Sequence, residues 1–162
     1  MGVEEVNGAV GASRADRNPV RENAAPTVAP SALHTSSSPD SATVLVVEDE
    51  ESVRRAIVRG LSIAGFRVLE ADGGETALAL IRAGVERIDL VLADVVMPGL
   101  SGPDVVRAAL TECPHMRVLF MSGYPDKTVF QPGMVRPGAP FLHKPFSFQE
   151  LVGAVRKVLG QD

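Results

Sequence analysis

Short apolar runs alternate with amphipathic stretches along the chain from Thr43 onward. The run Thr43–Val47 is continuous and rich in β-branched residues, a pattern typical of a strand buried on both faces. The stretch Glu51–Ala64 then carries apolar residues at helical spacing and stops at Gly65. The same reasoning predicts further strands at Phe66–Glu70, Ile88–Ala93, Arg117–Met121 and Ala139–Leu142, and further helices at Glu75–Ala83, from Pro103 to about Glu112, and from Ser147 onward.

Strand and helix alternate five times in this pattern, which favours an α/β fold with a single, doubly wound sheet of five parallel strands and helices on both faces. The last helix begins with the Ser147 and Glu150 spacing of a capping box. The segment between Tyr124 and Ala139 breaks the alternation because it is rich in proline and glycine, which are unfavourable inside a helix. We therefore expect the fourth helix to be short or missing, with at most one turn around Asp126–Phe130.

Residues 1–42 have a different composition from the rest. They contain four prolines, a run of three serines, many alanines and no aromatic residue. Such a segment cannot bury enough apolar surface to offset the entropy of ordering it. We predict an Ala/Pro/Ser-rich disordered tail or linker over residues 1–42 and a folded domain over residues 43–160.

The composition limits the cellular compartment and the kinds of partner that we expect. The chain of 162 residues suits one domain plus a tail, and its 45% hydrophobic content is enough for a core. Its single cysteine, Cys113, rules out an intramolecular disulfide, and we find neither a signal peptide nor a run of roughly 20 apolar residues. We expect a soluble, cytoplasmic protein with no membrane partner. The net charge of −4 argues against direct binding of nucleic acid and favours proteins as partners.

Polar side chains follow four of the five predicted strands. Glu48 and Asp49 follow the first strand and Asp94 the third, while Ser122 follows the fourth and Lys144 the fifth. In an open parallel sheet, sites form at the carboxyl ends of the strands. We therefore expect these five side chains to gather at one edge of the sheet.

Three carboxylates in one place repel one another, and a hard cation relieves that repulsion. Mg²⁺ prefers oxygen ligands and commonly binds one or two carboxylates together with phosphate oxygens. A metal, a carboxylate nucleophile, a hydroxyl and an ammonium group are together suited to phosphoryl transfer onto an aspartate. The pattern therefore predicts Mg²⁺ as the cofactor and phosphoryl transfer to an aspartate as the chemistry.

Four sequence blocks resemble the response regulator receiver family of two-component and phosphorelay systems, in order, spacing and strand position. They are VLVVEDE at 44–50, DLVLADVVMPG at 89–99, FMSG at 120–123 and FLHKPF at 141–146. The resemblance covers about residues 43–160 and implies the flavodoxin-like strand order 2-1-3-4-5.

The resemblance assigns a role to each site residue. It implies that Asp94 is the phospho-acceptor, and that Glu48, Asp49 and Asp94 hold the metal together with the backbone carbonyl of Val96. Gly102 matches a glycine that family members carry in the loop after the acceptor. The residues that bind phosphate or act as switches would be Ser122, Lys144 and Phe141.

By resemblance, the chain is a signalling receiver and not an enzyme with a separate substrate, although it assists its own phosphorylation and dephosphorylation. A histidine kinase or phosphotransfer protein would donate the phosphoryl group, and an unknown downstream protein would receive the signal by direct contact. The block MSGY at 121–124, followed by a shortened fourth helix, is similar to receivers of hybrid histidine kinases. A standalone protein and a piece of such a kinase therefore both remain open.

Three features depart from the common family pattern. Glu48 stands where aspartate is common, which lengthens one metal ligand, and Ser122 replaces the more frequent threonine. The proline- and glycine-rich segment Tyr124–Ala139 replaces most of the fourth helix, so the usual output surface and parallel dimer are not assumed.

Other interpretations remain open from the residues alone. The acidic run at 48–50 could be a solvated turn, Asp94 a turn residue, Lys144 a stop between strand and helix, and Phe141 a plain core aromatic. A binding scaffold with a receiver fold that works without phosphate is the alternative function. An aspartate-nucleophile phosphatase is disfavoured because Val96 stands where its D-x-D motif needs a second aspartate.

Overall fold

The computed structural model describes residues 41–84, 86–123 and 138–161. The predicted tail over residues 1–42 therefore lies outside the described residues, except for its last two. The segment 124–137, where we predict a short or missing fourth helix, lies outside them as well.

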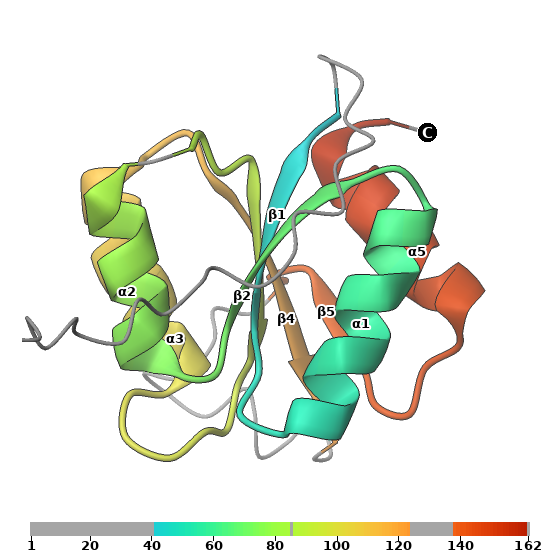
Figure 1. Cartoon of the computed structure of the whole chain (residues 1–162), viewed down its shortest axis with the longest axis horizontal. Helices are drawn as coiled ribbons and strands as arrows, with labels where there is room; N and C mark the ends of the chain where they lie inside the picture. Colours follow the sequence, from blue (N-terminus) through green and yellow to red (C-terminus); the bar gives the residue numbers. More distant parts are fainter. Residues whose placement is uncertain (1–40, 85, 124–137, 162) are drawn as a thin grey trace, which may run out of the picture. The chain divides into compact units, whose positions relative to one another are not determined.

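Strands and helices alternate along the described chain as predicted (Figure 1). In chain order they are β1 (Thr43–Val47), α1 (Glu51–Ile63), β2 (Arg67–Ala71), α2 (Gly74–Ala83), β3 (Leu90–Asp94), α3 (Gly102–Glu112), β4 (Arg117–Ser122), β5 (Phe141–His143) and α5 (Phe148–Leu159). The five strands form one sheet in the order β2-β1-β3-β4-β5, and each neighbouring pair is parallel. The predicted fold class and strand order are confirmed.

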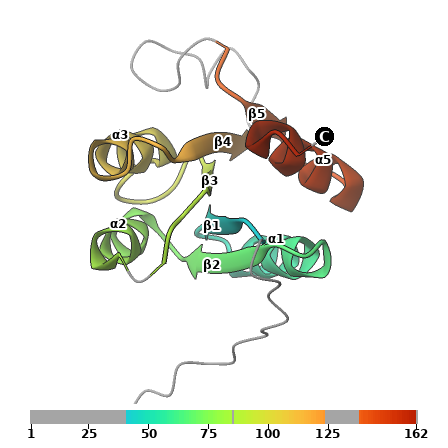
Figure 2. The same ribbon diagram turned by 90° about the horizontal axis from the view of Figure 1, so that it is seen from above.

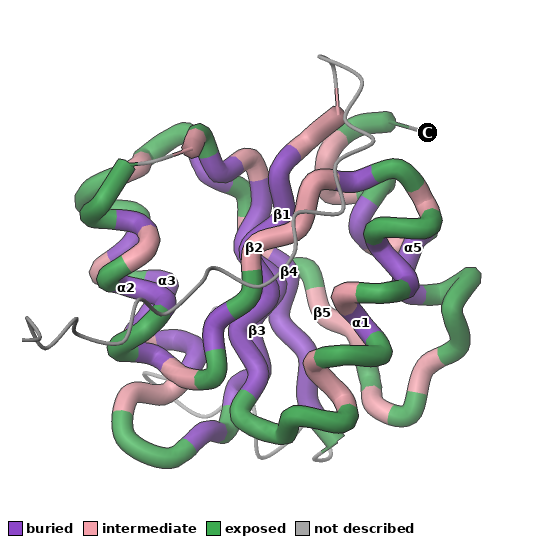
Figure 3. The backbone as a smooth tube through the Cα atoms, in the orientation of Figure 1, coloured by how far each residue is buried: buried purple, intermediate pink, exposed green. Residues whose placement is uncertain are grey.

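Helices cover both faces of the sheet. Seen from above, α2 and α3 lie on one face and α1 and α5 on the other (Figure 2). Alternate residues of β1 face opposite sides, so that Leu45 packs with α2 and α3 while Val44 packs with α1 and α5. Burial is concentrated in the central strands β1 and β3, where every residue is buried (Figure 3).

Three strands, β2, β3 and β5, begin later than predicted, and β2, β3, β4 and β5 each end one residue later than predicted. The amide of Phe66 donates to the Leu61 carbonyl at the end of α1 (3.1 Å), so β2 begins at Arg67. Pro140 has no amide hydrogen to donate to the ladder, and β5 begins at Phe141 instead of Ala139. In β3 pairing begins at Leu90 instead of Ile88 and runs through Asp94, which makes the predicted acceptor the last residue of the strand.

The last helix begins as its sequence predicts. The amide of Glu150 donates to Ser147 Oγ (3.2 Å), and the amide of Ser147 donates to Glu150 Oε2 (2.7 Å). This capping box fixes where α5 starts after the loop that follows β5. Among the described helices, none has the length and apolar content needed to cross a membrane.

The first residue of α3 packs directly against the strand end that carries Asp94. Gly102 is buried, and its amide donates to the Val95 carbonyl (3.3 Å). A Cβ atom at this position would overlap the carbonyl oxygen of Asp94. Only glycine fits at this position. Because it has no side chain, α3 can pack directly against the end of β3 that carries Asp94.

Replacing Gly102 by alanine should therefore destabilise the fold, by about 1–3 kcal/mol, as overpacking does in other cores. Gly153 offers a matched control, because it is an exposed glycine within α5 with no neighbour within 4 Å of an added Cβ. Gly153→Ala should stabilise the protein by about 0.5–1 kcal/mol through helix propensity. Urea unfolding of both variants measures the difference, and equal effects would contradict the close approach.

Candidate functional site

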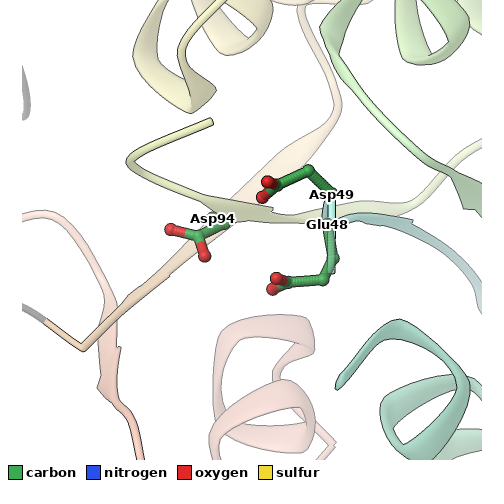
Figure 4. A group of neighbouring side chains, drawn as sticks. All are labelled: Glu48, Asp49 and Asp94. Atoms are coloured by element: carbon green, nitrogen blue, oxygen red, sulfur yellow. The ribbon is translucent and has the colours of Figure 1, made fainter. Parts of the chain in front are cut away.

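Three carboxylates meet at the carboxyl edge of the sheet. Glu48 and Asp49 directly follow β1, Asp94 ends β3, and the two strands are neighbours. The carboxyl groups of Glu48 and Asp49 both extend toward the end of β3 (Figure 4). One oxygen from each of the three residues lies within 4.8 Å of the others. Glu48 and Asp94 are buried, with 1% and 8% of their surfaces exposed, whereas Asp49 is exposed.

Lys144 joins two of these carboxylates. Its Nζ atom lies 2.6 Å from Glu48 Oε2 and 2.5 Å from Asp94 Oδ2. The lysine follows β5, and its amide donates to the Ser122 carbonyl of β4 (2.9 Å), which extends the ladder to this residue. The predicted convergence of residues 48, 94 and 144, which are far apart in the sequence, is thus present in the structure.

The second carboxylate oxygen of Asp94 has its own donor. The backbone amide of Val96 donates to Asp94 Oδ1 (3.0 Å), so both oxygens of the carboxylate are held. This contact uses the amide of Val96, whereas the family resemblance implies that the Val96 carbonyl binds the metal. The carbonyl's part in metal binding stays a prediction.

Burial and charge shift two pKa values in the site. Burial raises the pKa of Glu48 above its usual value of 4.5, and the hydrogen bond and charge of Lys144 offset this only in part. For Lys144, burial alone would lower the pKa, but hydrogen bonds and charges from Asp94 and Glu48 outweigh burial and raise it above 10.5. Lys144 therefore stays protonated at neutral pH, while the carboxylate form of Glu48 is disfavoured.

Ser122 and Phe141 lie on the neighbouring strands β4 and β5, and Phe141 pairs with Phe120, two residues before Ser122. Ser122 is the last residue of β4 and is fully buried. Phe141 begins β5, is half-buried, and packs against the core cluster that α2 and α3 share. Its ring also contacts the His143 ring in a tilted arrangement, with centroids 4.7 Å apart and an interplanar angle of 59°. Whether Ser122 and Phe141 act as switches stays a prediction.

Two contacts near the site were missed from the sequence. The contact between the Phe141 and His143 rings could have been predicted, because residues two apart on a strand face the same side of the sheet. The sequence gives no sign of the contact between Arg54 and the backbone carbonyls of Glu48 and Asp49, because an arginine in the second turn of a helix is common.

The donor set fits a hard divalent cation. Carboxylate oxygens are the protein ligands that Mg²⁺ prefers, and Glu48, Asp49 and Asp94 can each offer one from a shared space. Two of the three are buried, and within the described residues Lys144 is the ammonium group that pairs with them, so negative charge remains in excess there. A cation at this place would compensate that excess.

The raised pKa of Glu48 predicts how stability depends on pH in the absence of metal. A folded-state pKa above the unfolded value means that stability falls as the pH rises from about 4.5 through the folded pKa. Glu48→Gln removes the titratable carboxyl and with it this loss of stability. In EDTA the variant should match the native chain near pH 4 and become the more stable of the two as the pH approaches 7, as measured by thermal unfolding. A glutamine variant less stable than the native chain at pH 7 would mean that the Lys144 pair outweighs burial.

Comparisons with known proteins agree with this geometry. The response regulator receiver domain family matches residues 44–156. The sensor kinase CckA of Brucella abortus is 38% identical over 119 residues, which are 74% of this chain and 13% of the kinase. The response regulator receiver protein CpdR of the same organism is 30% identical over 116 residues, 72% of this chain and 95% of CpdR. The chain therefore spans about one eighth of the length of CckA and nearly all of CpdR.

Solved structures with a similar fold include receivers. The receiver domain of the hybrid histidine kinase CckA is 36% identical, with a TM-score of 0.62 over 72% of this chain and 98% of that one. A response regulator receiver protein from Sinorhizobium medicae WSM419 is 28% identical, with a TM-score of 0.67 over 76% and 98%. Receiver domains are signalling domains that work with histidine kinases or phosphotransfer proteins. This chain belongs to the response regulator receiver domain family.

Proposed function

We propose that Asp94 accepts a phosphoryl group from the phosphohistidine of a histidine kinase or phosphotransfer protein, and that the chain then signals by contact with a downstream protein. The observation that carries the proposal is the position of Lys144, whose Nζ lies within hydrogen-bonding distance of both Glu48 and Asp94. An ammonium group held on the acceptor carboxylate is already placed where the incoming negative charge must be neutralised.

The transfer exchanges one bond for another. A carboxylate oxygen of Asp94 forms a bond to phosphorus as the bond from phosphorus to the donor's imidazole nitrogen breaks, and the electron pair of the broken bond stays on that nitrogen. The Val96 amide and Lys144 orient the carboxylate through its two oxygens. A bound Mg²⁺, held by Glu48, Asp49, Asp94 and the Val96 carbonyl, would neutralise part of the charge on the phosphoryl oxygens.

The output is proposed to run through β4 and β5. The buried hydroxyl of Ser122 ends the strand beside the acceptor strand, so a phosphoryl group on Asp94 offers it a new acceptor. Movement of Ser122 would open space toward Phe141, which begins the next strand. A turn of the Phe141 ring would change the surface at the edge of the sheet that a partner reads.

The relatives support a phosphorelay role, in which the chain is a signalling domain and not an enzyme with a separate substrate. The chain resembles the receiver of a hybrid kinase as well as the whole of a receiver protein. The same Asp94 chemistry would therefore serve a standalone receiver and a receiver within a longer kinase.

Intact mass measured after incubation with acetyl phosphate and Mg²⁺ tests the acceptor. The native chain should gain one phosphoryl group, and the gain should disappear in EDTA and in Asp94→Asn, which keeps the shape of the side chain but not the nucleophile. Asp72→Asn is the control, because Asp72 is an exposed carboxylate in the turn after β2 that hydrogen-bonds Thr76. An adduct that persists in Asp94→Asn would refute the assignment. No adduct together with no Mg²⁺ binding would indicate a scaffold that works without phosphate.

Lys144→Ala should slow phosphorylation by acetyl phosphate roughly 10²-fold, a loss typical for one preorganised charge-stabilising donor. Lys157→Ala removes the same charge from the exposed last turn of α5 and should leave the rate unchanged. Rates of mass gain at saturating Mg²⁺ separate the two cases. If the two variants slow the reaction equally, Lys144 acts only through net charge.

A further inference from the structure

Arg54 holds the loop that carries the two adjacent carboxylates. It is the fourth residue of α1, and only 14% of its side chain is exposed. Its Nη1 atom donates to the backbone carbonyl of Glu48 (2.8 Å) and lies 3.5 Å from that of Asp49. The guanidinium therefore binds the main chain of both residues.

The same side chain reaches β2. Arg54 Nε lies 3.4 Å from Glu70 Oε2, and Glu70 belongs to the strand that pairs with β1. The amide of Glu48 also donates to the Ala71 carbonyl of β2 (3.1 Å). Residue 48 is thus held on both sides, through its amide by β2 and through its carbonyl by Arg54.

This arrangement determines where the carboxylates point. Asp49 is exposed, so its direction depends on its backbone and not on packing. The carbonyls of Glu48 and Asp49 turn toward Arg54, while their carboxyl groups extend toward Asp94 (Figure 4). Within the described residues, the ion pair of Arg54 is with Glu70, so Arg54 binds the main chain of the site and not its carboxylates.

We propose that Arg54 is a positioning residue for the metal site, which fixes the loop between β1 and α1 so that Glu48 and Asp49 present their carboxylates together with Asp94. The inference rests on the proposed function. Groups that orient metal ligands from behind typically change metal affinity 10–100-fold when removed. A planar guanidinium suits the task because its separate nitrogens can bind the carbonyls and Glu70 at the same time.

The neighbouring arginine provides a matched control. Arg55 Nη2 pairs with Glu51 Oε1 (2.6 Å) on the surface, where 76% and 63% of the two side chains are exposed. Arg55→Ala removes the same charge from the same helix without touching the loop. A surface pair of this kind contributes little to stability.

The experiment measures the Mg²⁺ dissociation constant of the full chain by calorimetry in native, Arg54→Ala, Arg54→Lys and Arg55→Ala forms. Arg54→Ala should weaken Mg²⁺ binding about tenfold. Arg54→Lys should lie between native and alanine, because one ammonium cannot reach the carbonyls and Glu70 together, and Arg55→Ala should match the native chain. Hydrogen exchange in EDTA is the second readout, and the Glu50 amide, which lies 3.4 Å from Glu48 Oε1, should exchange faster without Arg54.

The outcomes separate the positioning role from a structural one. A lower melting temperature for Arg54→Ala with unchanged Mg²⁺ affinity would overturn the inference, as would equal weakening in Arg55→Ala. If Arg54→Ala does not fold, Arg54→Lys decides, and a native-like dissociation constant for the lysine variant would also overturn it. Absence of Mg²⁺ binding by the native chain would instead refute the proposed function on which the inference rests.

Discussion

Two buried carboxylates share one ammonium group at the edge of the sheet, and the surrounding structure keeps them there. Glu48 and Asp94 would repel each other in this environment, and burial alone disfavours the charge on Glu48. Lys144 makes their proximity tolerable by hydrogen-bonding both. Among the described residues the pair is not fully compensated, since Asp49 adds a third carboxylate. The excess of negative charge favours a bound cation in this place.

The parallel sheet creates this constraint because it ends its strands at one edge. β1 and β3 are adjacent and end beside residues 48, 49 and 94. Lys144 follows β5, and its amide hydrogen-bonds the Ser122 carbonyl of β4, the strand between β3 and β5. Gly102 lets α3 lie against the acceptor strand, and Arg54 ties the acidic loop to β2. Each support acts on the backbone, so that the charged side chains stay available for the phosphoryl group and the metal.

Sequence patterns predicted the sheet, its covering helices and the meeting of four site residues, because strand ends in a parallel sheet converge whatever the loops do. They did not predict where pairing starts in β2 and β5, which depends on Phe66 closing α1 and on Pro140 lacking an amide hydrogen. The contact of Arg54 was also unpredictable, since a helix residue shows no sign of which carbonyl it reaches. The switch roles of Ser122 and Phe141 stay predictions, because they concern a change between two conformations of the protein.

Chemical trapping of the acceptor tests the central claim most directly. Borohydride reduces an aspartyl phosphate to homoserine, so reduction after incubation with a phosphorylated donor protein and Mg²⁺ marks the residue that carried the phosphoryl group. The account predicts homoserine at position 94 in the peptide that spans β3, with Asp49 unchanged in the peptide that spans β1. Homoserine at another position, or a stable label on a histidine such as His143, would contradict it.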